Sequence, residues 1–305
     1  MKKRLFVAFM LILAVGAAGA GVFSWLLLHR TPGEFFDSNG VPIYYTVEGR
    51  GEPVILIHGV AANADLNWRR PGVVRALSRD FQVITFDLRG HGRSGQPTDP
   101  AKYGMEMVED AVRLMDHLHI EKAHVAGYSL GGFITLKLVT THPDRIRSAA
   151  ICAAGWTDAT DPDQLPSPYS APVPPGDKAA RPREVAGASV LPSILPAATQ
   201  KTLFHRVRNW VGDQIVNKAA IKALKKSYRS LGIPEETLKS NKVPSILFIG
   251  SQDGFYYLAQ ELRSRMARME YECIQGANHF TTPLYGVFKR DLHDFFMRHR
   301  ATVNP

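Results

Sequence analysis

The sequence predicts an α/β fold with a mostly parallel, doubly wound sheet, and three patterns lead to that prediction. Short, continuous apolar runs of strand length recur along the 305 residues, and amphipathic stretches of helical length separate them. Most of the apolar runs end in a turn rich in glycine or polar residues. Strands buried on both faces have no polar side, so uninterrupted apolar runs indicate parallel strands covered by helices. Strand–helix alternation then favours a doubly wound sheet.

The first predicted element is a β-hairpin. Runs of strand character at Glu34–Asp37 and Pro42–Val47 flank the tripeptide Ser38-Asn39-Gly40. Asn-Gly between two such runs is a strong hairpin signal, because both residues tolerate the positive φ angles that a tight turn requires. We therefore expect an antiparallel pair of strands before the parallel part of the sheet.

Six further strands and five helices are predicted after the hairpin. The predicted strands are Val54–Ile57, Val83–Phe86, His124–Ala126, Ala149–Cys152, Ser245–Ile249 and Tyr271–Ile274. The predicted helices are Val73–Leu77, Met105–Leu118, Phe133–Thr141, Tyr257–Met269 and Pro283–Arg298.

Residues 157–242 interrupt this alternation. Seven prolines between residues 159 and 183 predict an extended segment. Apolar residues then recur at near-helical spacing from Leu203 to Leu231, with Lys and Arg between them. Pro234, followed by Glu235, predicts the start of another short helix. We interpret residues 157–242 as a helical lid inserted between two parts of one core, residues 31–156 and 243–305.

The N-terminal 30 residues predict a membrane segment. Leu5–Leu28 is a run of 24 residues without a charge, and three basic residues precede it. As a helix the run would span about 36 Å, enough for a bilayer core. The preceding positive charges place the N-terminus in the cytoplasm and the catalytic domain outside it. The alternatives are a signal peptide cleaved near Ala18-Gly19-Ala20, giving a secreted or periplasmic protein, and a buried helix of a cytosolic protein.

The net charge of +9 is confined to two segments. Residues 1–30 carry +4 and residues 178–242 carry +9, whereas residues 31–177 carry −5 and residues 243–305 carry +1. Basic residues without interleaved stacking aromatics are a weak nucleic-acid signal, so no nucleic-acid partner is expected. The basic lid is compatible either with an ordinary solvated helix face or with contact to anionic lipid headgroups.

Two cysteines, Cys152 and Cys273, provide no disulfide framework and no zinc module, and we expect both to be unpaired. The sequence contains no His-Glu-x-x-His motif, and His117, His119 and His124 lack metal-ligand spacing with nearby carboxylates. We therefore expect neither a metal site nor a cofactor.

A Gly-x-Ser-x-Gly motif joins a predicted strand to a predicted helix at residues 127–131, with Ser129 at its centre. This context is typical of a nucleophile elbow, in which glycines permit a sharp turn that lifts the serine hydroxyl above the sheet. The helix N-terminus behind the serine favours developing negative charge. Ser129 is therefore the predicted nucleophile.

Three motifs together resemble the α/β-hydrolase fold family, in its lidded serine esterase-like branch. They are His58-Gly59-Val60-Ala61, the stretch Asp87–Ser94 and the Ser129 elbow, and the resemblance covers residues 41–298. It implies an oxyanion hole made by the backbone N–H groups of Val60 and Leu130, which would stabilise the charge of a tetrahedral intermediate.

The remaining members of a catalytic triad are expected after Ser129, in the order acid and then histidine. Asp253 follows one predicted strand and His279 follows the next, and both positions lie where open α/β sheets place their sites. We predict Asp253 as the acid and His279 as the base. Asp158, which follows the preceding strand, is a competing candidate for the acid.

A serine at the elbow excludes the aspartate-nucleophile chemistry of haloalkane dehalogenases and lidded epoxide hydrolases of this fold. The sequence therefore predicts hydrolysis of a small carboxylic ester through an acyl-serine intermediate. The alternatives are hydrolysis of a carbon–carbon, lactone or amide bond, perhydrolase or acyltransferase activity, and slow-turnover ligand binding. Trp68 and Phe280 are candidates to line the substrate pocket, and a core role is an equal alternative.

Overall fold

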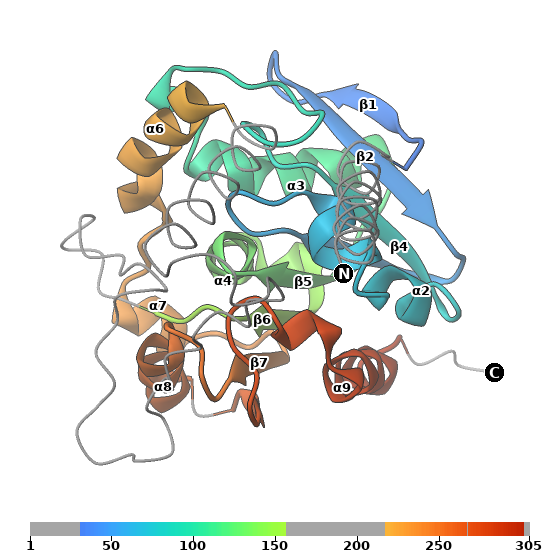
Figure 1. Cartoon of the computed structure of the whole chain (residues 1–305), viewed down its shortest axis with the longest axis vertical. Coiled ribbons are helices and arrows are strands. Elements are labelled where there is room, and N and C mark those ends of the chain that lie inside the picture. Colours follow the sequence, from blue (N-terminus) through green and yellow to red (C-terminus); the bar gives the residue numbers. More distant parts are fainter. Residues whose placement is uncertain (1–30, 157–216, 267, 302–305) are drawn as a thin grey trace, which may run out of the picture. The chain divides into compact units, whose positions relative to one another are not determined.

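An eight-stranded sheet with the order β1-β2-β4-β3-β5-β6-β7-β8 forms the centre of the computed structural model, which describes residues 31–156, 217–266 and 268–301 (Figure 1). Strands β3 to β8 run parallel, whereas β1 and β2 pair antiparallel, as does β2 with β4. The prediction of a mostly parallel sheet is confirmed. The strands are β1 Glu34–Asp37, β2 Pro42–Glu48, β3 Glu52–Ile57, β4 Phe81–Phe86, β5 Ala123–Tyr128, β6 Ile146–Cys152, β7 Ser245–Gly250 and β8 Glu270–Ile274.

The predicted hairpin is present between β1 and β2. Asn39 and Gly40 both adopt positive φ, 56° and 79°. This geometry matches the right-handed twist of the two strands, which explains why Asn-Gly occupies the turn. Strand β2 then pairs with β4 and joins the hairpin to the parallel strands.

Helices cover both faces of the sheet, as the alternation predicts. They are α2 Val73–Leu77, α3 Met105–His117, α4 Leu130–Thr141, α8 Tyr256–Arg265 and α9 Gly286–Arg298, with short helical turns η1 Asp65–Arg69, η2 Pro100–Lys102, η3 Pro143–Arg145 and η6 Thr282–Leu284.

Successive residues of a central strand belong alternately to two separate apolar clusters. On β3, Ile55 and Ile57 pack in the cluster that includes α3, α4 and α8, whereas Val54 and Leu56 pack in the cluster that includes α2 and α9. All four side chains are fully buried. Burial on both faces accounts for the continuous apolar runs of the sequence.

The described part of the predicted lid consists of α6 Lys218–Ser227, η5 Tyr228–Leu231 and α7 Glu235–Lys239. Helix α6 buries Ala220, Ala223 and Leu224 and exposes its lysines, so it is an amphipathic helix with a solvated basic face. The end of the predicted helix 203–231 is thus confirmed, and so is the short helix after Pro234. The predicted extended segment, residues 203–216 and Asp158 lie outside the described residues.

Two contacts tie the end of this insertion to the core. The indole N–H of Trp156, just after β6, donates to the carbonyl of Ile233 at 2.8 Å. The Lys137 ammonium on α4 donates to the neighbouring carbonyl of Gly232 at 2.7 Å. The chain therefore returns from the insertion beside the point where it left the sheet.

The predicted membrane anchor requires correction. Within the described ranges, each helix is too short or too polar to traverse a lipid bilayer. The longest of these, α3 and α9, have 13 residues each, which is about 20 Å against the ~30 Å of a bilayer core. The predicted localisation outside the cytoplasm depended on a membrane anchor, and we withdraw that prediction because no such helix is found among the described residues. The predicted segment Leu5–Leu28 itself lies outside the described residues.

A buried ion pair holds the Asp87–Ser94 stretch against α3. Arg89 and Asp110 are both fully buried and form two hydrogen bonds of 2.6 and 2.7 Å. Asp87 accepts the backbone N–H groups of Ala64 and Arg93, each at 2.9 Å. Asp87 is therefore a turn-forming residue that joins two loops at the carboxyl edge of the sheet.

Two buried histidines make the stability of the protein sensitive to acid. Burial lowers the pKa of His124 from its usual 6.5 to about 4, and burial lowers that of His91 to about 3. The unfolded chain therefore binds protons near pH 6.5 that the folded chain excludes. Stability is then lost as the pH falls from about 6.5 towards those lowered values.

We predict that the free energy of unfolding falls on going from pH 7 to pH 5, with His124 contributing about 2 kcal/mol of that loss. Urea unfolding at the two pH values would measure it. His124→Asn has no titrating ring, so its loss between the two pH values should be smaller by that amount. An equal loss in both proteins would contradict the assignment.

Candidate active site

Ser129 lies in a sharp turn between β5 and α4. Its backbone adopts φ 54° and ψ −117°, a conformation that a non-glycine residue rarely adopts. The Ser129 N–H donates to the carbonyl of Cys152 on the adjacent strand β6 at 2.8 Å. The serine stands at the N-terminus of the 12-residue helix α4, whose dipole favours negative charge there.

Glycines around Ser129 permit this turn because neighbouring backbone occupies the space of their missing side chains. A Cβ atom at Gly127 would collide with the carbonyl of Gly131 and the hydroxyl of Thr135. A Cβ atom at Gly131 would collide with the carbonyl of Ile57 on β3. The two glycines of the motif thus allow α4 to approach the sheet closely.

His279 joins Ser129 to Asp253. The imidazole Nε2 of His279 lies 3.0 Å from Ser129 Oγ, and Nδ1 lies 3.0 Å from both carboxylate oxygens of Asp253. Asp253 follows β7 and His279 follows β8, so both residues come from loops at the carboxyl ends of parallel strands. The structure therefore brings together the three side chains that the sequence singled out.

Burial shields this constellation from water. Ser129, Asp253 and His279 are 7%, 5% and 9% exposed. The Asp253 carboxylate also accepts the backbone N–H of Phe255 at 2.8 Å, which fixes the orientation of the carboxylate toward His279. With the carboxylate at Nδ1, the tautomer that leaves Nε2 free to accept a proton is favoured.

The His58-Gly59-Val60 turn packs directly against the serine. A Cβ atom at Gly59 would lie 3.0 Å from Ser129 Cβ. The Gly59 N–H donates to Asn67 Oδ1 at 2.9 Å, and the Gly59 carbonyl contacts His58 Nδ1 at 2.7 Å. A carbonyl can only accept, so His58 carries its hydrogen on Nδ1, and its Nε2 accepts the N–H of Leu88.

These contacts leave the next peptide N–H available. Among the described residues, neither the Val60 nor the Leu130 N–H donates a hydrogen bond to the protein backbone. Val60 follows Gly59, whose N–H and carbonyl are both hydrogen-bonded. Leu130 directly follows the serine in the first turn of α4. Asn67, which holds Gly59, was missed by sequence reasoning, because no local motif marks a side chain that reaches back across eight residues.

Aromatic rings surround His279. Phe255 and Phe280 lie edge-on to the imidazole with ring centroids 5.1 and 5.7 Å away, and Tyr128 lies at 5.7 Å. Phe280 is 62% exposed beside the base, so its role as a substrate contact stays a prediction.

The structure favours the second of the two roles that the sequence left open for Trp68, that of a core residue. Its side chain is fully buried in the apolar cluster with α2 and α9, and its ring packs edge-on against Tyr128 at 6.1 Å. Trp68 is one of the buried residues of the turn η1. Trp68 is therefore a core residue.

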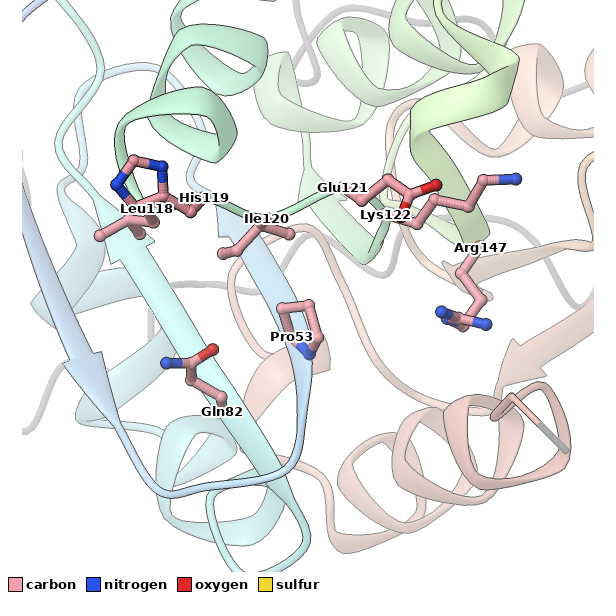
Figure 2. A pocket seen from close by; sticks show the side chains of 8 residues that line it. All are labelled: Pro53, Gln82, Leu118, His119, Ile120, Glu121, Lys122 and Arg147. Atoms are coloured by element: carbon pink, nitrogen blue, oxygen red, sulfur yellow. The ribbon is translucent and has the colours of Figure 1, made fainter. Parts of the chain in front are cut away.

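A depression of about 380 Å³ lies at the opposite edge of the sheet (Figure 2). Pro53 and Gln82 line it near the beginnings of β3 and β4, together with the Leu118–Lys122 turn and Arg147. The triad lies at the carboxyl ends of the parallel strands, whereas this depression lies at their amino ends. The length of the strands therefore separates the two. It plays no part in the candidate active site.

Ser129, His279 and Asp253 thus meet at the carboxyl ends of the parallel strands, connected by hydrogen bonds. The family model described as alpha/beta hydrolase fold matches residues 52–280, and the chain belongs to this family.

Two of the proteins that this chain resembles are named for the hydrolysis of different bonds. A protein of Azorhizobium caulinodans named for carbamate hydrolysis is 38% identical over 38% of this chain and 42% of its own length. A 2-hydroxymuconate semialdehyde hydrolase of Pseudomonas sp. strain CF600 is 40% identical over 32% of this chain and 35% of its own length. The chain thus matches less than half the length of these curated relatives.

The fold resemblance covers more of the chain. The structure of a meta-cleavage product hydrolase from Pseudomonas fluorescens IP01 superposes with a TM-score of 0.66 over 88% of this chain and 98% of that protein, at 20% identity. This likeness shows the shared fold.

The close packing around the elbow leads to a stability prediction. Gly127→Ala should lower the free energy of unfolding by about 3 kcal/mol or more, because backbone carbonyls cannot move away from the added methyl group. Gly286→Ala is the control, because nothing lies within 4 Å of its added Cβ at the start of α9. Denaturant unfolding of both variants would test this. Equal stabilities would contradict the packing argument.

Proposed function

We propose that the protein is a serine hydrolase in which Ser129 is the nucleophile, His279 the general base and Asp253 the supporting acid. The observation that carries the proposal is the continuous hydrogen-bonded chain from Ser129 Oγ through the imidazole to the Asp253 carboxylate. The ordering of these groups matches the roles that acyl transfer to serine requires.

In the first step, Ser129 Oγ attacks the substrate carbonyl carbon while its proton passes to Nε2 of His279. Asp253 stabilises the resulting imidazolium without taking the proton. The carbonyl oxygen becomes an oxyanion beside the N-terminus of α4, where the N–H groups of Val60 and Leu130 are its proposed donors. Preorganised donors of this kind contribute about 3 kcal/mol each to transition-state stabilisation.

The intermediate then collapses to an acyl-serine. The bond to the leaving group breaks, and the leaving group takes the proton from Nε2 of His279. Water next attacks the acyl carbon while His279 accepts a proton from it, and collapse of the second tetrahedral intermediate returns that proton to Ser129 Oγ. The products are a carboxylic acid and the protonated leaving group.

A small carboxylic ester is the first proposed substrate class. Its alkoxide leaves with the single proton that His279 carries, so no further acid is required. Two exposed apolar side chains, Val60 and Phe280, are 37% and 62% exposed beside the site. They favour a substrate with an apolar group near the scissile carbonyl.

Hydrolysis of another bond is the second candidate, and the relatives favour it. The two curated relatives are named for a carbamate and for 2-hydroxymuconate semialdehyde, rather than for a simple ester. The same nucleophile and base would serve such substrates, with the proton delivered to a different leaving atom. Residues outside the triad then decide the bond that is cleaved.

The nucleophile can be identified directly. We predict that a fluorophosphonate labels wild-type protein once, at Ser129, and that Ser129→Ala abolishes both labelling and hydrolysis. Ser264→Ala, which removes an exposed hydroxyl on α8, should retain both. Intact-protein and peptide mass spectrometry would measure the label. Stabilisation by a ligand without labelling or turnover would instead indicate a binding protein.

The bond class can be decided with a substrate panel. We predict the highest kcat/KM on a short-chain p-nitrophenyl ester, with lower values on an aryl carbamate and on 2-hydroxymuconate semialdehyde. Ser129→Ala serves as the blank for each reaction. A higher kcat/KM on either of the other substrates would replace the ester proposal with the second candidate.

A further inference from the structure

The proposed nucleophile and base follow two strands that are not neighbours in the sheet. Ser129 follows β5 and His279 follows β8, and the sheet order places β6 and β7 between these two strands (Figure 1). Three strand spacings amount to about 14 Å. Ladder hydrogen bonds between β5 and β8 therefore cannot hold the His279 loop over the end of β5, and the connection has to come from contacts outside the sheet.

The His279 loop is attached to the Asp253 side of the site by its main chain. The Gln252 N–H donates to the carbonyl of Ala277 at 2.9 Å, and the Gly276 N–H donates to the hydroxyl of Ser251 at 2.9 Å. Asn278 stabilises the loop internally by accepting two of its backbone N–H groups. These contacts set the base relative to the acid and do not reach the nucleophile strand.

Tyr128 supplies the connection to the nucleophile strand. It is the last residue of β5 and is bonded directly to Ser129. Its phenol donates to the main-chain carbonyl of His279 at 2.7 Å, and its side chain is buried. Its ring is packed edge-on against Trp68, with the centroids 6.1 Å apart. The nucleophile and the base are thus linked by one peptide bond and one hydrogen bond.

We propose that Tyr128 is a positioning residue that holds the main chain of His279 over β5, so that the imidazole Nε2 stays within reach of Ser129 Oγ. The inference rests on the proposed roles of Ser129 and His279. Tyr128 touches neither the substrate nor the transferred proton, and it acts through the base.

The Tyr128 contact differs from the Ser129–His279 contact in one important respect. The hydrogen bond between Ser129 Oγ and Nε2 reverses its donor when the serine proton passes to the imidazole, and Oγ no longer carries a proton once it is acylated, so this contact does not hold the base in the same way through the whole cycle. The phenol-to-carbonyl bond takes no part in proton transfer and persists through each step. Burial raises the pKa of Tyr128 well above its usual 10, so the phenol remains a donor at neutral pH.

Tyr128→Phe tests this role because it keeps the ring and removes the hydroxyl. The His279 carbonyl would lose a buried partner, and the loop would relax to hydrate it. We expect kcat, and the rate constant for fluorophosphonate labelling, to fall by about tenfold or more, because small displacements of reacting groups are costly. KM should change little, since the phenol does not face the substrate.

Tyr103→Phe is the matched control. The Tyr103 phenol also donates to a main-chain carbonyl, the partly buried one of Pro97 at 2.6 Å, but it lies in the loop before α3. Both variants should lose comparable stability in thermal unfolding, whereas Tyr103→Phe should keep the wild-type kcat and labelling rate. Measurements are made well below the melting temperature of either variant, so that rates report on folded protein.

Three results would overturn the inference. Labelling of Tyr128→Phe at the wild-type rate would show that the phenol does not position the base. A raised KM with unchanged kcat would place the phenol against the substrate instead. A wild-type protein that does not react with the fluorophosphonate would remove the proposed function, and the inference would fall with it.

Discussion

The close approach of α4 to the sheet is the constraint on which the site depends. At Gly127 the backbone of α4 occupies the space that a side chain would need, and at Gly131 the carbonyl of Ile57 on β3 does so; the strained turn at Ser129 lies between these two contacts. The strain is held by surrounding backbone hydrogen bonds rather than relieved. The serine thereby stands at the N-terminus of α4, where the helix dipole would stabilise the oxyanion of the proposed reaction.

The parallel sheet supplies the rest of the geometry. Its strands all end at one edge, so loops far apart in the sequence meet there, and the hydrogen-bonded chain from Ser129 to Asp253 is assembled from three of them. Each member has a second contact that fixes its orientation: Cys152 for the Ser129 N–H, Phe255 for the carboxylate and Tyr128 for the main chain of His279. The site is therefore rigid where the proposed proton transfers occur.

Features with a local cause could be predicted from the sequence. The Asn39-Gly40 hairpin, the buried strands and the turn at Ser129 each follow from a few neighbouring residues whose conformational preferences agree. Long-range contacts could not be predicted this way. The Asn67 carboxamide holds Gly59 across a loop, and Trp68 is buried in an apolar cluster that includes residues far from it in the sequence. The apolar run and the basic residues before it led to the membrane-anchored localisation, which is withdrawn because none of the described helices could cross a membrane.

The hydrogen bond from Trp156 to Ile233 has a consequence for how this enzyme could acquire new substrates. The inserted segment leaves and rejoins the core at neighbouring points, so its two ends span the same short gap whatever lies between them. The entropic cost of a longer or shorter insertion rises slowly with its length. Selection can therefore exchange this segment as a unit while the proton-transfer machinery at the strand ends is left unaltered.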